Sequence, residues 1–153
     1  MPSPGKMQSF LLLSRLVFGL RRRIQVSVDA PLMEELGFGL REVMILRSIE
    51  VGEKSPSKIS DLIGSPLASI SRSLNLLEEL GMIERVQGTK DKRRSVLELT
   101  NVGESSVRRA REIMQVVLTA EYEHVSEPDL VEAVLALSRL AITMGERSEY
   151  LEN

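Results

Sequence analysis

The sequence predicts a mainly α-helical fold that carries one small β-hairpin. Over most of the 153 residues, apolar side chains recur every three or four positions, which is typical of helices packed on a core. Residues 82–100 differ, because two apolar or alternating runs flank a charged turn, the pattern of two antiparallel strands. Hydrophobic residues make up 42% of the chain but aromatic residues only 3%, so the expected core is aliphatic.

The first predicted element is a long helix over residues 7–28 that is apolar on two sides. One stripe comprises Phe10, Leu13, Val17, Leu20 and Ile24, and a second surface comprises Leu11, Leu12, Leu16 and Phe18. A helix of this kind needs more than one partner, so we expect one face to meet its own domain and the other a second subunit. The alternative is burial inside a single monomer. We expect the helix to end at residues 29–31, where a proline follows Asp29 and Ala30, and residues 33–38 to form a connector.

Two shorter helices are predicted next. Gly39 is the expected N-cap of a helix that runs to about residue 51, with Glu42 in the reciprocal capping position. A helix over residues 56–63 follows, and Gly64 supplies the tight turn after it.

The helix predicted over residues 65–80 has a polar outer face. Ser65 and Pro66 are its expected cap and first residue, and an apolar stripe at helical spacing is expected to face the core. The polar residues off that stripe are of types that contact base edges and phosphates: Ser69, Ser71, Arg72 and Asn75. The alternative is an ordinary amphipathic helix with a solvated face. Lys58, near the start of the preceding helix, is a weaker candidate phosphate contact.

The hairpin turn, residues 87–95, is basic. It holds one acid among four cations: Lys90, Asp91, Lys92, Arg93 and Arg94. A basic ribbon tip can lie in a minor groove, and Asp91 can fix the Arg93 rotamer by a charge-assisted hydrogen bond. A solvated hairpin tip is the alternative. A helix with a polar outer face beside such a hairpin predicts a winged helix-turn-helix.

Two amphipathic helices are predicted over residues 101–123 and 126–144. Together with the first helix they predict a helical dimerisation layer, and its candidate contacts are Phe10, Leu13, Val17, Leu137 and Leu140. The expected organisation is therefore an N-terminal dimerisation helix at 1–38, a winged helix-turn-helix at 39–100 and C-terminal dimerisation helices at 101–153.

Charge and composition restrict the chemistry. The net charge is −2, but residues 54–94 carry eight Lys or Arg against five Asp or Glu (+3), whereas residues 121–153 carry two against eight (−6). There is no Cys and only one His, so neither a disulfide framework nor a His-rich metal site is expected. No catalytic or cofactor motif occurs, so we expect neither an enzyme nor a cofactor. The apolar run 10–20 is shorter than the roughly 20 residues that span a bilayer, so we expect a soluble cytoplasmic protein.

The order of elements and four motifs resemble the multiple-antibiotic-resistance regulator (MarR) family. The motifs are SISR at 69–72, EELGMIER at 78–85, DKRRSVLELT at 91–100 and NVGE at 101–104, in which Leu99, Thr100 and Gly103 occupy the places of a Leu-Thr-x-x-Gly pattern. The resemblance implies an obligate homodimer that binds a palindrome, with Asp91 and Arg93 as the wing pair. The chain departs from the family pattern in two places: the cap at 65–66 comes one residue early, and Gly39 replaces a Thr or Ser.

From these observations we expect a dimeric, sequence-specific regulator of double-stranded DNA, and a repressor, that recognises a pseudo-palindrome. Helix 65–80 would enter the major groove and wing 87–95 the minor groove. The alternative is a winged helix that binds proteins and not DNA. The resemblance also implies a small aromatic or anionic effector, although the sequence does not identify its pocket. Arg21, Arg22 and Arg23 would either pair with such an anion or with acidic partner residues, or form a solvated cluster at the helix C-terminus.

Overall fold

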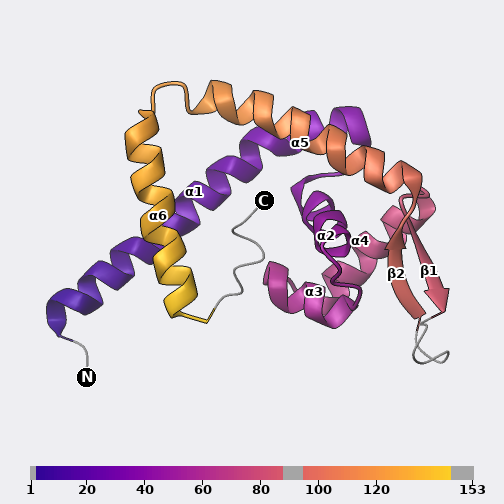
Figure 1. Ribbon diagram of the computed structural model, residues 1–153, viewed down its shortest axis with the longest axis horizontal. Coiled ribbons are helices and arrows are strands. Elements are labelled where there is room, and N and C mark those ends of the chain that lie inside the picture. The colour runs from indigo at the N-terminus through magenta and orange to yellow at the C-terminus, as the bar shows by residue number, and fades with distance from the viewer. Residues whose placement is uncertain (1–2, 88–94, 146–153) are drawn as a thin grey trace. The chain divides into compact units, whose positions relative to one another are not determined.

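The computed structural model describes residues 3–87 and 95–145. Within these residues it contains six helices and a two-stranded antiparallel sheet (Figure 1). The chain divides into two compact units, Met1–Leu118 and Thr119–Asn153. The mainly helical fold with one small hairpin is as the sequence predicted.

The first unit is built around a three-helix cluster and a hairpin. Its elements are α1 (Pro4–Leu36), α2 (Leu40–Glu50), α3 (Pro56–Ile63), α4 (Leu67–Glu79), β1 (Ile83–Gln87), β2 (Ser95–Leu99) and most of α5 (Asn101–Glu121). In the hairpin Ile83 pairs with Leu99 and Gln87 with Ser95. The hairpin leads directly out of α4, and β1 packs against that helix (Figure 1).

One aliphatic core joins all these elements. Its largest fully buried side chains come from α1, α2, α3, α4, β2, α5 and the connection between α1 and α2, and all but Phe38 are aliphatic: Val28, Leu32, Phe38, Ile45, Leu46, Ile59, Ile70, Leu74, Leu77, Leu97 and Val107. The second half of α1 and the first turns of α5 thus pack on the same core as the winged segment. The predicted inward face of α4 is confirmed.

The predicted end of α1 is wrong. The helix does not stop at residues 29–31 but continues through Pro31 to Leu36, so most of the expected connector is helical. An internal proline costs about 3 kcal/mol. Val28 and Leu32 are both fully buried, and such side chains contribute about 1.5–3 kcal/mol each, which offsets that cost. The helix ends instead at Gly37, whose φ of 79° is the left-handed conformation that favours glycine.

The start of α4 also differs from the prediction. Pro66 is the N-cap and Leu67 the first helical residue, so Ser65 is not the cap. Ser65 belongs to the preceding turn, because its carbonyl oxygen accepts a hydrogen bond from Ser60 Oγ at 2.7 Å. Gly64 forms this turn with a φ of 67°, as expected.

The second unit contains α6 (Glu127–Thr143). Its N-cap is Ser126, whose Oγ accepts from the Asp129 N–H at 3.3 Å and donates to Asp129 Oδ2 at 2.6 Å. None of the residues of α6 is buried. In the described part of the chain, no helix combines the length and the apolar character that are needed to cross a membrane.

Candidate nucleic-acid interface

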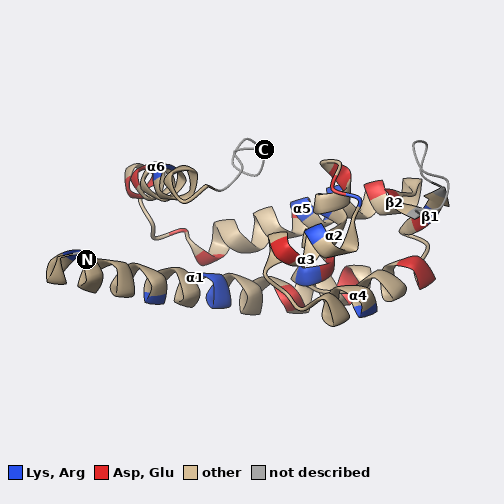
Figure 2. Ribbon diagram, turned by 90° about the horizontal axis from the view of Figure 1, so that it is seen from below, with Lys and Arg blue, Asp and Glu red and all other residues tan. Residues whose placement is uncertain are grey.

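The helix α4 separates an apolar face from a polar one. Ile70, Leu74 and Leu77 are at most 1% exposed. On the remaining surface Ser71, Arg72 and Asn75 are exposed and Ser69 is half-buried. The acidic residues of α4 lie at its C-terminal end, beside the hairpin, and its one cation lies nearer the middle (Figure 2). The N-terminal two thirds of the helix therefore present hydroxyl, amide and guanidinium groups without a carboxylate.

The Arg72 guanidinium is held against its own helix. Its Nη2 donates to Ser69 Oγ at 3.1 Å, one turn earlier. This contact uses one of five N–H donors, and the side chain stays at the surface. Two of the predicted contact residues thus form one polar group on α4.

Lys58 lies on α3 with its side chain 65% exposed. Its Nζ is 3.7 Å from Oε2 of Glu53, whose side chain is 16% exposed. The ammonium itself is exposed and the distance is long, so this contact does little to hold it in place.

Two ion pairs hold the base of the hairpin. On one side Lys54 Nζ contacts Glu98 Oε1 at 2.6 Å, and on the other Arg85 Nε donates to Glu78 Oε2 at 3.1 Å. Glu84 lies directly opposite Glu98, a like-charge pair that would be unfavourable without a cation. Lys54 supplies that cation, and Arg85 ties β1 to the end of α4. The base of the wing is therefore linked to the end of α4 and to the connection between α2 and α3.

The tip of the hairpin lies outside the described residues. The predicted wing contacts all fall there: Lys90, Asp91, Lys92, Arg93 and Arg94. Their roles, and the Asp91–Arg93 pair, stay predictions.

The Leu-Thr-x-x-Gly pattern joins the hairpin to two helices. Thr100 Oγ1 donates to the Gly81 carbonyl at 2.7 Å and accepts from the Gly103 N–H at 3.1 Å. A Cβ at residue 103 would overlap the carbonyl oxygen of Met82, so only glycine allows α5 to start so close to the chain. The motif therefore fixes where the wing ends relative to the end of α4.

Sequence reasoning missed a buried contact of α4. Ser73, which follows Arg72, is 5% exposed and donates its Oγ to Glu42 Oε1 at 2.6 Å. The two residues are 31 positions apart. The only available signal was a serine on the inward side of an otherwise apolar stripe.

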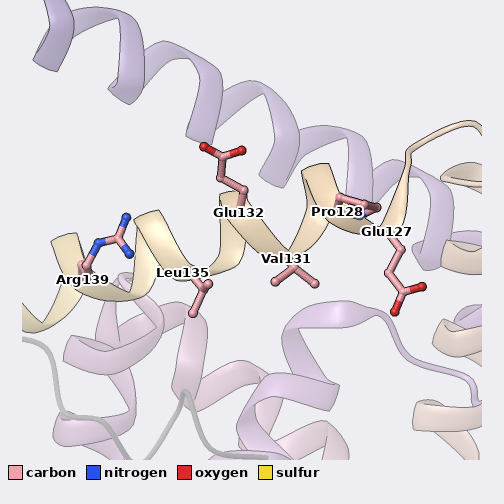
Figure 3. Close-up of a pocket in the computed structure, with 6 residues that line it drawn as sticks. All are labelled: Glu127, Pro128, Val131, Glu132, Leu135 and Arg139. Atoms are coloured by element: carbon pink, nitrogen blue, oxygen red, sulfur yellow. The ribbon is translucent and has the colours of Figure 1, made fainter.

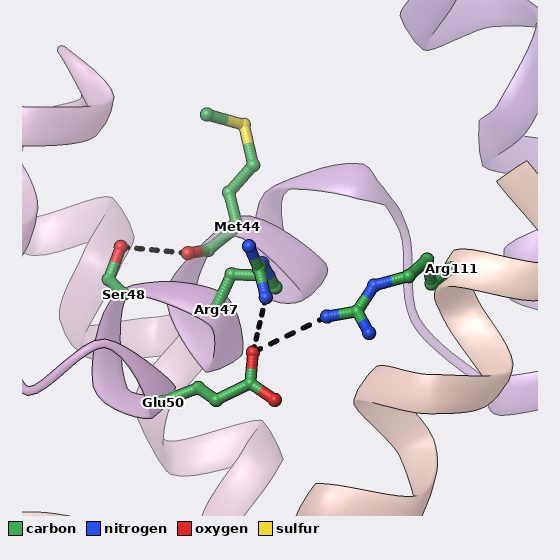
Figure 4. Close-up of polar contacts among 5 residues, drawn as sticks. All are labelled: Met44, Arg47, Ser48, Glu50 and Arg111. Carbon is green, nitrogen blue, oxygen red and sulfur yellow. Dashed lines mark hydrogen bonds and ion pairs between the residues drawn. The ribbon is translucent and has the colours of Figure 1, made fainter. Parts of the chain in front are cut away.

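Charged side chains also connect α5 to α1 and α2. Arg109 contacts Glu35 of α1 at 2.6 Å and Glu112 at 2.8 Å. The hydrogen bond to Glu112 and then that to Glu35 raise the pKa of Arg109 above its ordinary value. Arg111 lies 3.7 Å from Glu50, which also binds Arg47 (Figure 4).

The interpretation of Arg21–Arg23 as a C-terminal cluster is wrong. The three arginines lie near the middle of α1 with exposed side chains, because the helix runs on to Leu36. The helix dipole acts only within the last turn, so it does not account for them.

The described residues offer no metal site, and one hollow among them is poorly suited to an anion. They hold no group of three His, Cys, Asp or Glu that could bind a metal ion. A shallow hollow on α6 is lined by Glu127, Pro128, Val131, Glu132, Leu135 and Arg139 (Figure 3). With two carboxylates and one cation, this lining does not favour an anionic ligand.

The helix-turn-helix of α3 and α4, followed by the β1–β2 hairpin, defines a winged helix-turn-helix. The sequence profile of the MarR family matches residues 36–94, which include α2, α3, α4 and β1 and end before β2. This segment of the chain is thus similar to the corresponding segment of MarR-family proteins. MarR-family transcriptional regulators are not enzymes, in agreement with the absence of catalytic motifs. No curated protein sequence matches the chain.

Solved structures of transcriptional regulators share this fold. The regulator BldR of Sulfolobus solfataricus is 20% identical, with a TM-score of 0.75 over 88% of this chain and 98% of that one. Wild-type apo MarR of E. coli is 18% identical, with a TM-score of 0.74 over 84% and 96%. A MarR family protein of Mycobacterium tuberculosis, in complex with p-aminosalicylic acid, is 20% identical, with a TM-score of 0.70 over 84% and 98%.

Proposed function

We propose that this chain is a dimeric transcriptional regulator that binds a pseudo-palindromic double-stranded DNA site. In this proposal α4 enters the major groove and the wing at residues 87–95 contacts the minor groove, as in other winged helices. The protein acts as a repressor, and a small aromatic or anionic effector releases it from DNA.

The polar face of α4 carries the proposal. Ser71, Arg72 and Asn75 are exposed while the opposite face of the helix is buried in the core. Arginine can bind guanine and asparagine adenine in the major groove, and serine can contact either base or phosphate. These residues occur on the second helix of a helix-turn-helix, the element that docks on DNA in this class.

Exposed apolar side chains support a homodimer. Phe10, Val17, Leu137 and Leu140 are 52%, 42%, 40% and 42% exposed, and Leu13 is half-buried. Further exposed apolar residues of the same two helices are Leu11, Leu12, Leu16, Phe18, Leu20, Val131, Val134 and Leu135. On each helix, exposed apolar side chains in this number support a protein–protein interface.

Effector release is supported by a relative. The Mycobacterium tuberculosis protein of the same fold is solved in complex with p-aminosalicylic acid, an aromatic anion. This compound is therefore the first probe for loss of DNA binding by the present chain. The pocket that would receive it is not assigned to particular residues.

The test is a fluorescence-anisotropy titration of the protein with labelled duplexes. One duplex comes from the region upstream of its own coding sequence, and the other is a scramble of the same composition. We expect tighter binding to the first, with a dissociation constant that rises steeply with salt because phosphate contacts release counterions. Equal weak binding to both duplexes and to duplexes selected from a random pool would overturn the proposal and favour a protein-binding winged helix.

A further inference from the structure

Three hydrogen bonds connect α1, α2 and α4 around the first turn of α2. Asp29 Oδ1, on α1, accepts from the Leu40 N–H at 2.8 Å. Glu42 Oε2 accepts from the Gly39 N–H at 3.2 Å, and Glu42 Oε1 accepts from Ser73 Oγ at 2.6 Å. Two carboxylates thus bind the start of α2, and one of them also binds α4.

Gly39 makes this arrangement possible. Glycine has no side chain that could cap the helix, and Asp29 supplies the missing acceptor from α1. A Cβ at residue 39 would lie 2.8 Å from Asp29 Oδ1, closer than real Cβ atoms approach an oxygen. The glycine that replaces the usual Thr or Ser therefore admits a carboxylate from a different helix.

The Ser73 hydroxyl lies behind the exposed face of α4. Ser73 is 5% exposed, and its neighbours in the chain, Arg72 and Ser71, lead directly to the polar face. Glu42 is half-buried, and hydrogen bonds to a charged group are stronger than those between neutral groups. A rotation of α4 that moved Arg72 would break the bond to Glu42.

We propose that Asp29, Glu42 and Ser73 are positioning residues that set the placement of α4 for specific DNA recognition. None of them is proposed to touch DNA. Their hydrogen bonds meet at the start of α2. They thereby hold the exposed face of α4 in a fixed position relative to α1. This inference rests on the proposed function and adds to it residues that determine specificity indirectly.

The test compares Ser73→Ala with a matched control, Ser48→Ala. Ser48 is also a buried serine, 3% exposed, but its Oγ donates to the Met44 carbonyl of its own helix at 2.8 Å (Figure 4). Both changes remove one buried hydroxyl, and only the first removes a contact between helices. Glu42→Ala and Glu42→Gln form a second pair, since glutamine keeps an acceptor for Gly39 and a partner for Ser73.

The first readout is the ratio of affinities for the specific and the scrambled duplex. We expect Ser73→Ala and Glu42→Ala to lower this ratio about fivefold or more, the range of coupling between separated sites. Ser48→Ala and Glu42→Gln should stay close to the unchanged protein. A thermal melt of each variant identifies any that fails to fold. Unchanged ratios in folded Ser73→Ala and Glu42→Ala would overturn the inference and leave the proposed function intact.

The second readout needs no DNA. Amide hydrogen exchange of Gly39 and Leu40, followed by NMR, should accelerate in Ser73→Ala and Glu42→Ala but not in Ser48→Ala. If the unchanged protein binds no duplex specifically, the proposed function fails, and this exchange still decides whether α4 and the start of α2 are coupled. Equal exchange in all variants would show that they are not.

Discussion

The helices α4 and α6 have the same kind of sequence pattern and different surroundings. On α4 the residues Ile70, Leu74 and Leu77 are at most 1% exposed, because the rest of the first unit covers them. On α6 the equivalent stripe includes Leu137 and Leu140, which are 40% and 42% exposed. Apolar periodicity shows that a helix face is suited to burial, but the hydrophobic effect is non-directional and does not say whether its own chain or another covers the face.

Helix α1 contains both buried and exposed apolar residues. Val28 and Leu32 in its second half are fully buried, whereas Phe10 and Phe18 in its first half are 52% and 68% exposed. The boundary between the two lies close to the three arginines at 21–23. The second half thus belongs to the core, and the first half resembles α6 in its exposed apolar residues.

The largest expected effect is on stability, and it separates α4 from α6. Leu77→Ala should lower the free energy of unfolding by about 2–5 kcal/mol, because it leaves a cavity in the core. That loss should not depend on protein concentration. Leu137→Ala should instead produce a loss that is small where the protein is monomeric and grows as concentration rises, because the proposed partner covers this residue only in the dimer. Urea unfolding of both variants at two protein concentrations measures the difference; concentration-independent losses in both would remove the distinction.

The first half of α1 should behave like α6. The double variant Leu13→Asp, Val17→Asp places two carboxylates on the proposed interface and should raise the dimer dissociation constant by at least about tenfold, an effect typical of central interface residues. Sedimentation velocity measures this change. The control is Val102→Asp, which alters an exposed apolar residue at the start of α5. A dimer that stays intact in the double variant would contradict the assignment of this stripe.

A third expected effect distinguishes the exposed face of α4 from an ordinary solvated helix surface. Arg72→Ala should weaken specific DNA binding by about 1–3 kcal/mol if the guanidinium contacts a base. Arg108→Ala is a matched control, since Arg108 Nη2 donates to Ser105 Oγ at 3.0 Å in the same one-turn geometry on α5. Anisotropy titrations at moderate salt compare the two. Equal affinities would show that the Arg72 side chain is only a helix-surface group.

The wing arginine provides a related prediction. Arg93→Ala should also cost about 1–3 kcal/mol in DNA binding, as expected for a groove contact. The same titration should show that the loss is larger on the specific duplex than on the scramble. A variant with unchanged affinity for both duplexes would exclude Arg93 from the interface.

The smallest expected effect concerns the base of the hairpin. Arg85 and Glu78 are 38% and 41% exposed, and exposed pairs contribute about 0–1 kcal/mol. Arg85→Gln should therefore change the unfolding free energy by less than about 1 kcal/mol, with a smaller change at high salt. Thermal melts at two ionic strengths measure it. A large, salt-independent loss would show that this pair does more than the exposure of its side chains indicates.

Local sequence patterns correctly predicted the helices α2 and α3, the hairpin and the inward face of α4. They gave wrong or incomplete predictions where a contact between residues far apart in the sequence determines the structure. Pro31 looked like a helix end, but burial of Val28 and Leu32 carries α1 past it. The Ser73–Glu42 bond joins residues that no local spacing connects.

Only the exposed residues of the candidate site could be predicted from the sequence. Ser71, Arg72 and Asn75 are exposed because they fall off an apolar stripe, and that depends on helix period alone. The cap of α4 could not be placed, because Ser65 and Pro66 both suit a helix start and the bond from Ser60 decides between them.

The close contact between Gly103 and the Met82 carbonyl limits where residues can be inserted or deleted in this chain. Because α5 begins against the Met82 carbonyl, its rotation about its own axis is fixed from its first turn. One residue inserted between Thr100 and Gly103 would turn everything beyond it by about 100°, the rotation per residue of an α-helix. Val107 and Ala110 would then leave the core. Insertions and deletions should therefore be tolerated far less between the hairpin and α5 than in connections where no backbone contact sets the helical phase.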